Sequence, residues 1–441
     1  MRPSDAGERR ADLLAGAAGT RRADLLAGAA AVALFALAAV VGAVLGLAGH
    51  PVRAPAAPLF GHVLPHVGPG TPLALVVAGL TVLCGPTLAD RLSWPRLLGA
   101  GYAAALAWTF SLALVDGWHR GLAGRLTTRH EYLTEVYRVT VRGFADRILD
   151  GQPDAWTTHV AGHPPGALLV FAGLDRIGLG GGGWAATVCV LVGASVAVTV
   201  PSTVRVLAGD AAARAAVPFV VLFPGAVWVG ASADGLFTGV TAAGVAVLAV
   251  AAVRGRHGLA AGAGVVLGAG CFLSYGLVLM APVALAVLVV ARRWVLLPAA
   301  VAGALAVAGA FAVAGFWWLD GYHLVVERYH QGIADDRPYA YWVWANLACV
   351  VAAAGPVAAV FLRRLVGGGP RWLLLPASAV VALVLADVSG LSKAEVERIW
   401  LPFTVWLMSA AAVLPAGDRR RWLAVQAATA LAVNHLVLTA W

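Results

Sequence analysis

Long apolar blocks alternate with short polar breaks along almost the whole chain. Each block is about 18 to 24 residues long, which is enough for one helix to cross a hydrocarbon core of about 30 Å. A soluble fold has no place for so many such blocks, because its surface helices keep one polar face. The pattern predicts an all-helical, polytopic membrane protein, with a cytoplasmic stub over residues 1–24 and a single membrane domain over 25–441.

The arginines set the expected topology. Arginine-containing breaks lie at 205–214, 254–257, 292–293, 363–371 and 418–421. The positive-inside rule places these breaks in the cytoplasm and the polar or aromatic breaks between them outside. The first crossings are expected at 25–48, 71–89 and 97–115, with the N-terminus cytoplasmic. A non-crossing helix at 165–178 then precedes a span at 184–206, and the sum is about thirteen spans in the cytoplasmic membrane.

Composition and charge remove several classes of function. Hydrophobic residues make up 61% and charged residues 12% of the chain, against about 25% charged in a soluble domain. The net charge of +9 does not indicate a nucleic-acid partner, because most arginines fall in short loops between apolar blocks. The four cysteines lie inside apolar blocks without zinc or redox spacing, and they are Cys84, Cys189, Cys271 and Cys349.

The long polar segment at 116–183 is the expected outer loop and the place where loop-borne function should lie. Helical spacing predicts an amphipathic surface helix over 129–150. Its polar stripe would hold Glu131, Glu135, Arg138, Arg142 and Asp146. Glu131 has two interpretations here, a functional carboxylate or the end of a capping box that begins at Thr128.

A histidine follows, directly before two prolines. Pro164 and Pro165 bar a helix before Pro165 and allow one immediately after it. His163 is therefore expected just ahead of a helix start at the membrane surface. A lone histidine is more often structural than catalytic, so its weight comes from the combination with the acidic loop.

Together these residues resemble a family signature. Glu131-Tyr132, then His163-Pro-Pro-Gly166 and a short helix to Gly178 are similar to the signature of GT-C transferases related to protein O-mannosyltransferases and bacterial aminoarabinose transferases. The chain departs from that signature at His130, where the family has aspartate, and at Gly166, where it has leucine. Two spans also precede the usual first one.

Weaker similarities continue to about residue 405. They are Phe223-Pro224 followed by Asp234, Leu273-Ser-Tyr-Gly276, and Glu397-Arg398-Ile-Trp-Leu-Pro402. Their order, always on the expected outer side, matters more than any single match. A composition rich in Ala, Val, Gly and Arg is typical of a GC-rich bacterial genome, of actinobacterial type.

The resemblance implies inverting transfer of a sugar, mannose or a pentose, from a polyprenyl-phosphate donor on the outer face. The acceptor would be an envelope glycan, lipid or protein. An attacking hydroxyl needs a base, for which Glu131 is the first candidate and Asp116 the second. His163 would orient the acceptor or contact phosphate, and Arg398 would grip phosphate. Asp234 would lie near the sugar, or would simply cap the next span.

Other expected substrate contacts are Tyr132, Glu135, Arg138, Tyr275, Tyr329 and His330. The aromatic loop 320–339 suits a sugar, although an interfacial aromatic belt would have the same composition. No cofactor is certain, and a divalent cation stays open because the His/Asp spacing in that loop is not diagnostic. Two rival classes remain. A transporter or flippase would show internal symmetry, which we do not find, and an inactive scaffold is favoured by His130.

Overall fold

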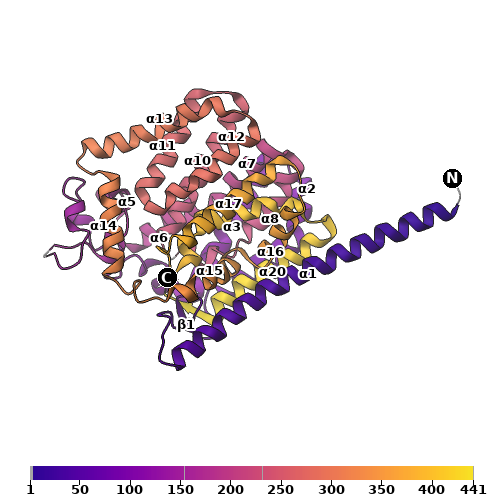
Figure 1. Cartoon of the computed structure of the whole chain (residues 1–441), viewed down its shortest axis with the longest axis horizontal. Helices are drawn as coiled ribbons and strands as arrows, with labels where there is room; N and C mark the ends of the chain where they lie inside the picture. Colours follow the sequence, from indigo (N-terminus) through magenta and orange to yellow (C-terminus); the bar gives the residue numbers. More distant parts are fainter. Residues whose placement is uncertain (1–2, 153, 231, 441) are drawn as a thin grey trace.

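The fold is a bundle of helices with one small two-stranded antiparallel sheet (Figure 1). The computed structural model describes residues 3–152, 154–230 and 232–440, with side chains from residue 19 onward. The longer helices are α1 (Pro3–Leu47), α2 (Thr71–Arg91), α3 (Trp94–Ala113), α5 (Pro165–Arg176), α6 (Gly182–Ala194), α7 (Val196–Ala208), α8 (Asp210–Val221), α10 (Asp234–Arg254), α11 (His257–Leu273), α12 (Ala281–Ala291), α13 (Leu297–Val313), α14 (Trp318–His330), α15 (Tyr339–Ala354), α16 (Val357–Val366), α17 (Leu374–Val388) and α20 (Ala416–Leu436). The short elements used below are α4 (Thr158–Ala161), α18 (Val396–Ile399), α19 (Leu401–Thr404), β1 (Gly61–Val63) and β2 (Val437–Thr439).

The all-helical, polytopic fold class is confirmed. Within the described residues, seven helices are long and apolar enough to cross a membrane, or eight if α15 and α16 form one broken span bent by 108°. Three shorter apolar helices, at His257–Leu273, Tyr275–Ala291 and Leu401–Val413, fall below the length of a full crossing. The expected count of about thirteen is not confirmed. Several apolar blocks consist of short helices and 3-10 turns rather than of one full-length helix, and hydropathy along the sequence does not show these breaks.

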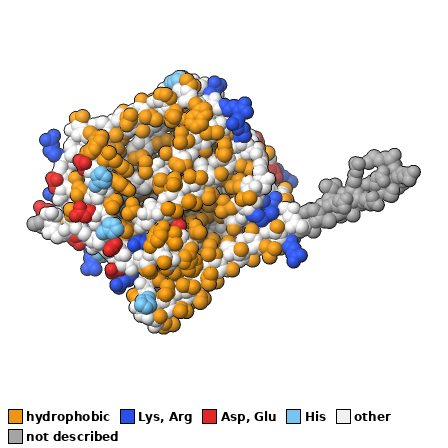
Figure 2. All heavy atoms as spheres, in the orientation of Figure 1, with side chains coloured by type: hydrophobic (Ala, Val, Ile, Leu, Met, Phe, Trp, Pro, Cys, Tyr) orange, Lys and Arg blue, Asp and Glu red, His pale blue; other side chains and the backbone are white. Residues whose placement is uncertain are grey.

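Side-chain polarity divides the molecule into zones. Figure 2 shows hydrophobic side chains across the middle of the visible face, with charged groups gathered toward its two ends. One end carries mostly Lys and Arg, and the other mixes Asp, Glu and His with Arg. This distribution is the one expected for a protein whose middle lies in hydrocarbon.

Glycines let neighbouring helices approach closely in the middle of the bundle. A Cβ atom on Gly264 of α11 would lie 1.9 Å from the carbonyl oxygen of Ala300 in α13, and one on Gly303 of α13 would lie 2.0 Å from that of Ala261. Any larger side chain would therefore push α11 and α13 apart. Small residues at such contacts are typical of membrane helices, whose association depends on close packing rather than on burial from water.

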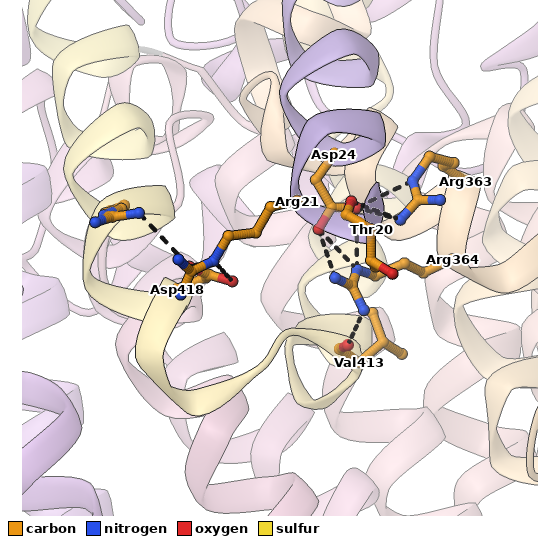
Figure 3. Close-up of polar contacts among 8 residues, drawn as sticks. Thr20, Arg21, Asp24, Arg363, Arg364, Val413 and Asp418 are labelled. Atoms are coloured by element: carbon orange, nitrogen blue, oxygen red, sulfur yellow. Dashed lines mark hydrogen bonds and ion pairs between the residues drawn. The ribbon is translucent and has the colours of Figure 1, made fainter. Parts of the chain in front are cut away.

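Three segments that the arginine pattern placed in the cytoplasm lie together. Asp24 of α1 is buried and accepts hydrogen bonds from Arg363 (3.0 Å) and Arg364 (3.1 Å) at the end of α16. Arg21, one turn earlier in α1, pairs at 3.0 Å with Asp418 at the start of α20 (Figure 3). These ion pairs hold α1 against α16 and α20 at one end of the bundle, so residues 21–24, 363–364 and 418 share one side.

The predicted amphipathic helix over 129–150 is wrong. The segment is a chain of turns with two single-turn 3-10 helices, at Val136–Arg138 and Ala145–Arg147. Val139 is extended and Gly143 has a φ of 73°, and both interrupt helical geometry. The capping-box interpretation of Glu131 falls with the helix, since no helix starts there.

Buried aromatic packing explains why turns replace the helix. Phe144 and Ile148 are fully buried, and Phe144 packs on Trp156 and on Phe316. The indole of Trp156 donates a hydrogen bond of 2.9 Å to the carbonyl of Phe144. Phe144 and Ile148 are thus buried within the protein rather than presented to a membrane surface.

The Asp24 cluster generates a stability prediction. Asp24→Asn removes the anion shared by Arg363 and Arg364, so we expect a loss of about 2–4 kcal/mol of stability, because breaking a buried pair leaves uncompensated charge. Thermal unfolding of the purified protein in detergent measures this loss. Asp210→Asn is the control, since Asp210 is a half-exposed partner of Arg205 and Arg214 and should cost at most about 1 kcal/mol. Equal unfolding temperatures for Asp24→Asn and wild type would contradict the anchoring role.

Candidate functional site

The candidate site lies between the loop after α3, the start of α10 and the α18 segment. Figure 1 shows the loop with α5 and α14 at one end of the bundle, far from the end where α1 projects. The prolines place the first part of the site as expected, since α5 begins at Pro165 with His163 just before it. The short helix α4 (Thr158–Ala161) directly precedes His163 and carries His159.

Glu131 is a buried carboxylate beside a buried histidine. Its side chain is 3% exposed, and its Oε1 lies 3.5 Å from Nε2 of His159. Backbone contacts fix the pair, because His159 N–H donates to the carbonyl of His130 (2.9 Å) and Thr157 Oγ1 donates to that of Glu131 (3.1 Å). The two stretches of loop are thereby joined, and Glu131 is held in place without a helix.

Burial controls the protonation of this pair. The pKa of Glu131 is raised to about 8, mainly by burial; Arg398 opposes the rise, and Asp234 and Glu395 add to it. Burial also lowers the pKa of His159 well below its usual range, so its imidazole is neutral at pH 7. Glu131 is therefore poised to exchange a proton near physiological pH, a property that favours acid–base work.

Arg398 is the buried cation of the site. Its Nη1 donates to Oδ2 of Asp234 at 2.7 Å, and its Nη2 donates to Oε2 of Glu395 at 2.9 Å. The side chains of Arg398 and Asp234 are each 6% exposed. Burial works against the charge, but the two carboxylates outweigh it and raise the pKa of Arg398, so the guanidinium stays charged.

Asp234 acts as an ion-pair partner rather than as a cap. Helix α10 begins at Asp234, its N-cap position is Ala233, and no side chain caps its first turn. The carboxylate instead accepts from Arg398. The capping interpretation of Asp234 is wrong, because the strongest donor in reach is a buried guanidinium and charge-assisted bonds exceed those to backbone amides.

His163 packs against the aromatic rings of Tyr132 and Phe237. Its ring centroid lies 5.7 Å from that of Tyr132 and 5.6 Å from that of Phe237. Its Nδ1 donates to the carbonyl of His159 (2.7 Å), which leaves the lone pair on Nε2. Burial lowers the pKa of His163, with Asp234 opposing, so the ring is a neutral hydrogen-bond acceptor.

The structure thus brings together five of the residues predicted from sequence: Glu131, Tyr132, His163, Asp234 and Arg398. The others have different partners. Asp116 binds His66 (2.9 Å) and Arg125 (3.2 Å) near the β1–β2 sheet, where Arg125 also donates to the carbonyl of Thr439.

The remaining candidates are likewise engaged elsewhere. Glu135 pairs with Arg138 at 3.1 Å inside the loop. Tyr275 packs on Trp318. Tyr329 donates to the carbonyl of Gly390 at 3.2 Å, and His330 forms an exposed contact with Asp335.

Sequence reasoning missed three residues of the site. They are His159, Glu395, and Arg337, whose Nη2 donates to Oε1 of Glu395 at 2.8 Å. His159 is four residues before His163, a spacing that puts both on one helical face and could have been read as a signal. Glu395 has a φ of 61°, and nothing in its sequence context signals a left-handed residue there. Arg337 belongs to loop 320–339, for which the sequence predicted sugar contacts from the aromatic residues only.

Metal binding has no ligand set among the residues that the structure describes. No group of three or more His, Cys, Asp or Glu side chains is placed there to hold an ion. An apolar-walled pocket of about 180 Å³ opens beside Phe171, between residues 127–137, α5 and α6. Phe171 packs on Tyr132 at 5.2 Å, but Glu131, Asp234 and Arg398 do not line the pocket. The charged centre itself is closed.

Among known proteins, the similarity to this chain that we find is to a solved structure. No family model matches the sequence, and no curated protein matches it. A similar solved structure is that of ArnT from Cupriavidus metallidurans in the apo state, which is 17% identical over 72% of this chain, with a TM-score of 0.46. The chain spans 59% of the length of that structure.

The Asp234–Arg398 pair generates a stability prediction. Asp234→Asn leaves a buried guanidinium with one anionic partner fewer, so we expect a loss of about 3–5 kcal/mol, measured by thermal unfolding in detergent. Adding Arg398→Gln should recover part of the loss, because it removes the uncompensated charge. Asp335→Asn is the control, since Asp335 is half-exposed and its loss should cost at most about 1 kcal/mol. Strictly additive losses in the double variant would show that the two residues are not coupled.

Proposed function

We propose that the protein transfers a sugar from a polyprenyl-phosphate donor to a hydroxyl acceptor on the outer face of the cytoplasmic membrane. One observation carries the proposal. A buried carboxylate with a raised pKa, Glu131, shares an enclosed site with a buried cation, Arg398, at one end of a membrane bundle. The resemblance of the surrounding motifs to those of GT-C transferases supports the same conclusion.

The membrane setting selects the donor class. Nucleotide sugars are not available outside the cytoplasm, so a sugar used there arrives on a lipid whose tail stays in the bilayer. The charged end of the bundle then meets the phosphate and the sugar, while apolar helices face the tail. The apolar-walled pocket is lined by residues of the loop and by Phe171, whose ring packs on that of Tyr132.

The proposed step is a single displacement. The acceptor oxygen attacks the anomeric carbon and its proton passes to the carboxylate of Glu131, which acts as general base. The bond between the anomeric carbon and the phosphate oxygen breaks, and its electron pair leaves with the polyprenyl phosphate. Arg398 stabilises the charge that develops on that phosphate. One displacement inverts the anomeric configuration.

The neighbours of Glu131 support this division of roles. Nε2 of His163 offers a lone pair to a sugar or acceptor hydroxyl, since its Nδ1 is committed to a carbonyl. The neutral His159 beside Glu131 accommodates the carboxyl group in either protonation state. The rings of Tyr132 and Phe237 provide apolar surface, which suits a face of a sugar ring.

Replacing the base is the first test. We expect Glu131→Gln to lower the rate of transfer from radiolabelled polyprenyl-phosphate mannose by about 10²–10⁴-fold, because general-base catalysis contributes that much. The measurement uses membranes with matched amounts of each variant. Asp146→Asn is the control, an exposed acidic residue of the same loop, and should transfer at the wild-type rate.

The outcomes separate the competing classes. Equal transfer by wild type and Glu131→Gln would remove Glu131 as the base. Donor binding without turnover, across several acceptors, would favour a flippase or an inactive scaffold over a transferase.

The pH dependence tests the protonation state directly. Because the pKa of Glu131 is raised to about 8, its basic form is complete above that pH and is lost as the pH falls. We therefore expect kcat/KM for transfer to rise about tenfold per pH unit below pH 8 and to level off above it. A flat profile between about pH 6 and 8 would show that no group with a raised pKa limits the reaction.

A further inference from the structure

A second arginine lies beside the site and is not absorbed by the mechanism above. Arg337 precedes α15, and its side chain is 4% exposed. Its Nη1 donates to the carbonyl of Lys393 (2.6 Å), and its guanidinium lies over the ring of Phe60 at 5.3 Å. Its Nε is buried, with no hydrogen-bond partner among the described residues. A buried donor without a partner is costly, so this Nε gains most from a ligand that offers it an acceptor.

One carboxylate joins Arg337 to Arg398. Oε1 of Glu395 accepts from Nη2 of Arg337 at 2.8 Å, and Oε2 accepts from Nη2 of Arg398 at 2.9 Å. Glu395 is 16% exposed, more than either arginine. The two guanidinium groups thus face a single anion from two sides, and that anion is the member of the trio nearest to solvent.

The backbone that presents this carboxylate is strained. Ala394 and Glu395 have φ values of 65° and 61°, a left-handed geometry that is unfavourable for a residue with a Cβ. Asn346 holds the strained pair, because its Oδ1 accepts from Ala394 N–H (3.3 Å) and its Nδ2 donates to the carbonyl of Ser392 (2.8 Å). Strain of this kind persists only where the surroundings enforce it, and it gathers at ligand sites.

We propose that Glu395 occupies the place of a phosphate group between Arg337 and Arg398, and that the phosphate of a polyprenyl phosphate displaces it on binding. The proposal rests on the proposed function, because it assigns the lipid phosphate of that donor to these two arginines. Arg337 becomes a phosphate-binding residue, and Glu395 becomes an internal competitor.

The chemistry of the exchange is favourable. Carboxylate and phosphate both present paired oxygens to a guanidinium fork, so one can replace the other without moving the arginines. Phosphate has a further oxygen, which the unused Nε of Arg337 can bind. One anion leaves as another enters, so the charge around Arg398 and Asp234 is preserved, and release of Glu395 lets its backbone relax.

Binding of polyprenyl phosphate to the full-length protein in nanodiscs tests the exchange, with the uncharged polyprenol as the reference ligand. We expect Arg337→Gln to weaken binding of the phosphate about ten- to a hundredfold, because it removes charge-assisted hydrogen bonds. Arg328→Gln is the matched control. Arg328 is a largely buried arginine of α14 that pairs with Asp150, outside the trio, and its loss should leave binding unchanged.

Glu395→Gln should change the affinity for polyprenyl phosphate in the opposite direction. Without the internal anion, polyprenyl phosphate should bind about tenfold more tightly than to wild type. Arg337→Lys keeps the charge without the planar fork and should bind at an intermediate level, which supplies a second measurement if Arg337→Gln unfolds. Thermal unfolding identifies folded variants.

Inorganic phosphate in excess should compete weakly if the lipid-borne group is the true occupant, and fully if the site takes free phosphate.

Each outcome supports or overturns the exchange. Wild-type affinity in folded Arg337→Gln and Arg337→Lys, weaker binding in Glu395→Gln, or equal binding of polyprenol and polyprenyl phosphate would overturn it. Complete competition by inorganic phosphate would overturn the lipid assignment. Transfer that requires Glu131 but ignores Arg337 would overturn this inference and leave the proposed function standing. If the Arg337 and Glu395 variants bind polyprenyl phosphate as expected but no sugar is transferred, the exchange would stand and the proposed function would be overturned.

Discussion

The burial of Arg398 is the constraint on which the end of the bundle that carries the loop after α3 depends. A guanidinium removed from water must be surrounded by anions and acceptors, or the desolvation cost of several kcal/mol goes uncompensated. Asp234 comes from the start of α10 and Glu395 from the strained turn before α18, so satisfying one cation fixes two segments that are 161 residues apart. Arg337 then adds a third segment through Glu395. Ion pairing, not apolar packing, thus positions the charged centre.

The same cluster sets the state of Glu131. Arg398 favours ionisation of Glu131, while burial and the carboxylates of Asp234 and Glu395 oppose it, and the opposition prevails. Both positive charges, on Arg398 and Arg337, are already matched by Asp234 and Glu395. A further buried carboxylate therefore gains little from ionising, and the pKa of Glu131 is raised. This coupling ties the protonation of Glu131 to the charge around Arg398.

Sequence reasoning predicted the parts of this arrangement that depend on local rules. Span-length blocks at α2, α3 and α10 gave the membrane class, and Pro164-Pro165 placed His163 before a helix. The helix over 129–150 was wrong because a 3.6-residue pattern of apolar positions also arises when turns bury Phe144 and Ile148 separately. Such tertiary packing overrides periodicity and leaves no local signal. Glu395 was missed for a related reason, since only its backbone geometry and distant partners distinguish it.

The departure at His130 can now be weighed from its surroundings. The expected family pattern has an aspartate beside the glutamate, and its replacement was the main argument for an inactive scaffold. The His130 ring is exposed, where its Nε2 accepts from Arg129 (3.0 Å), whereas its carbonyl binds His159 and so helps to hold Glu131. The side chain at this position therefore lies at the surface, and Asp234 supplies an acidic group near Glu131 from another part of the chain. Loss of the aspartate changes the rim of the site and leaves its buried charges intact, which weakens the case for a scaffold and strengthens that for an enzyme.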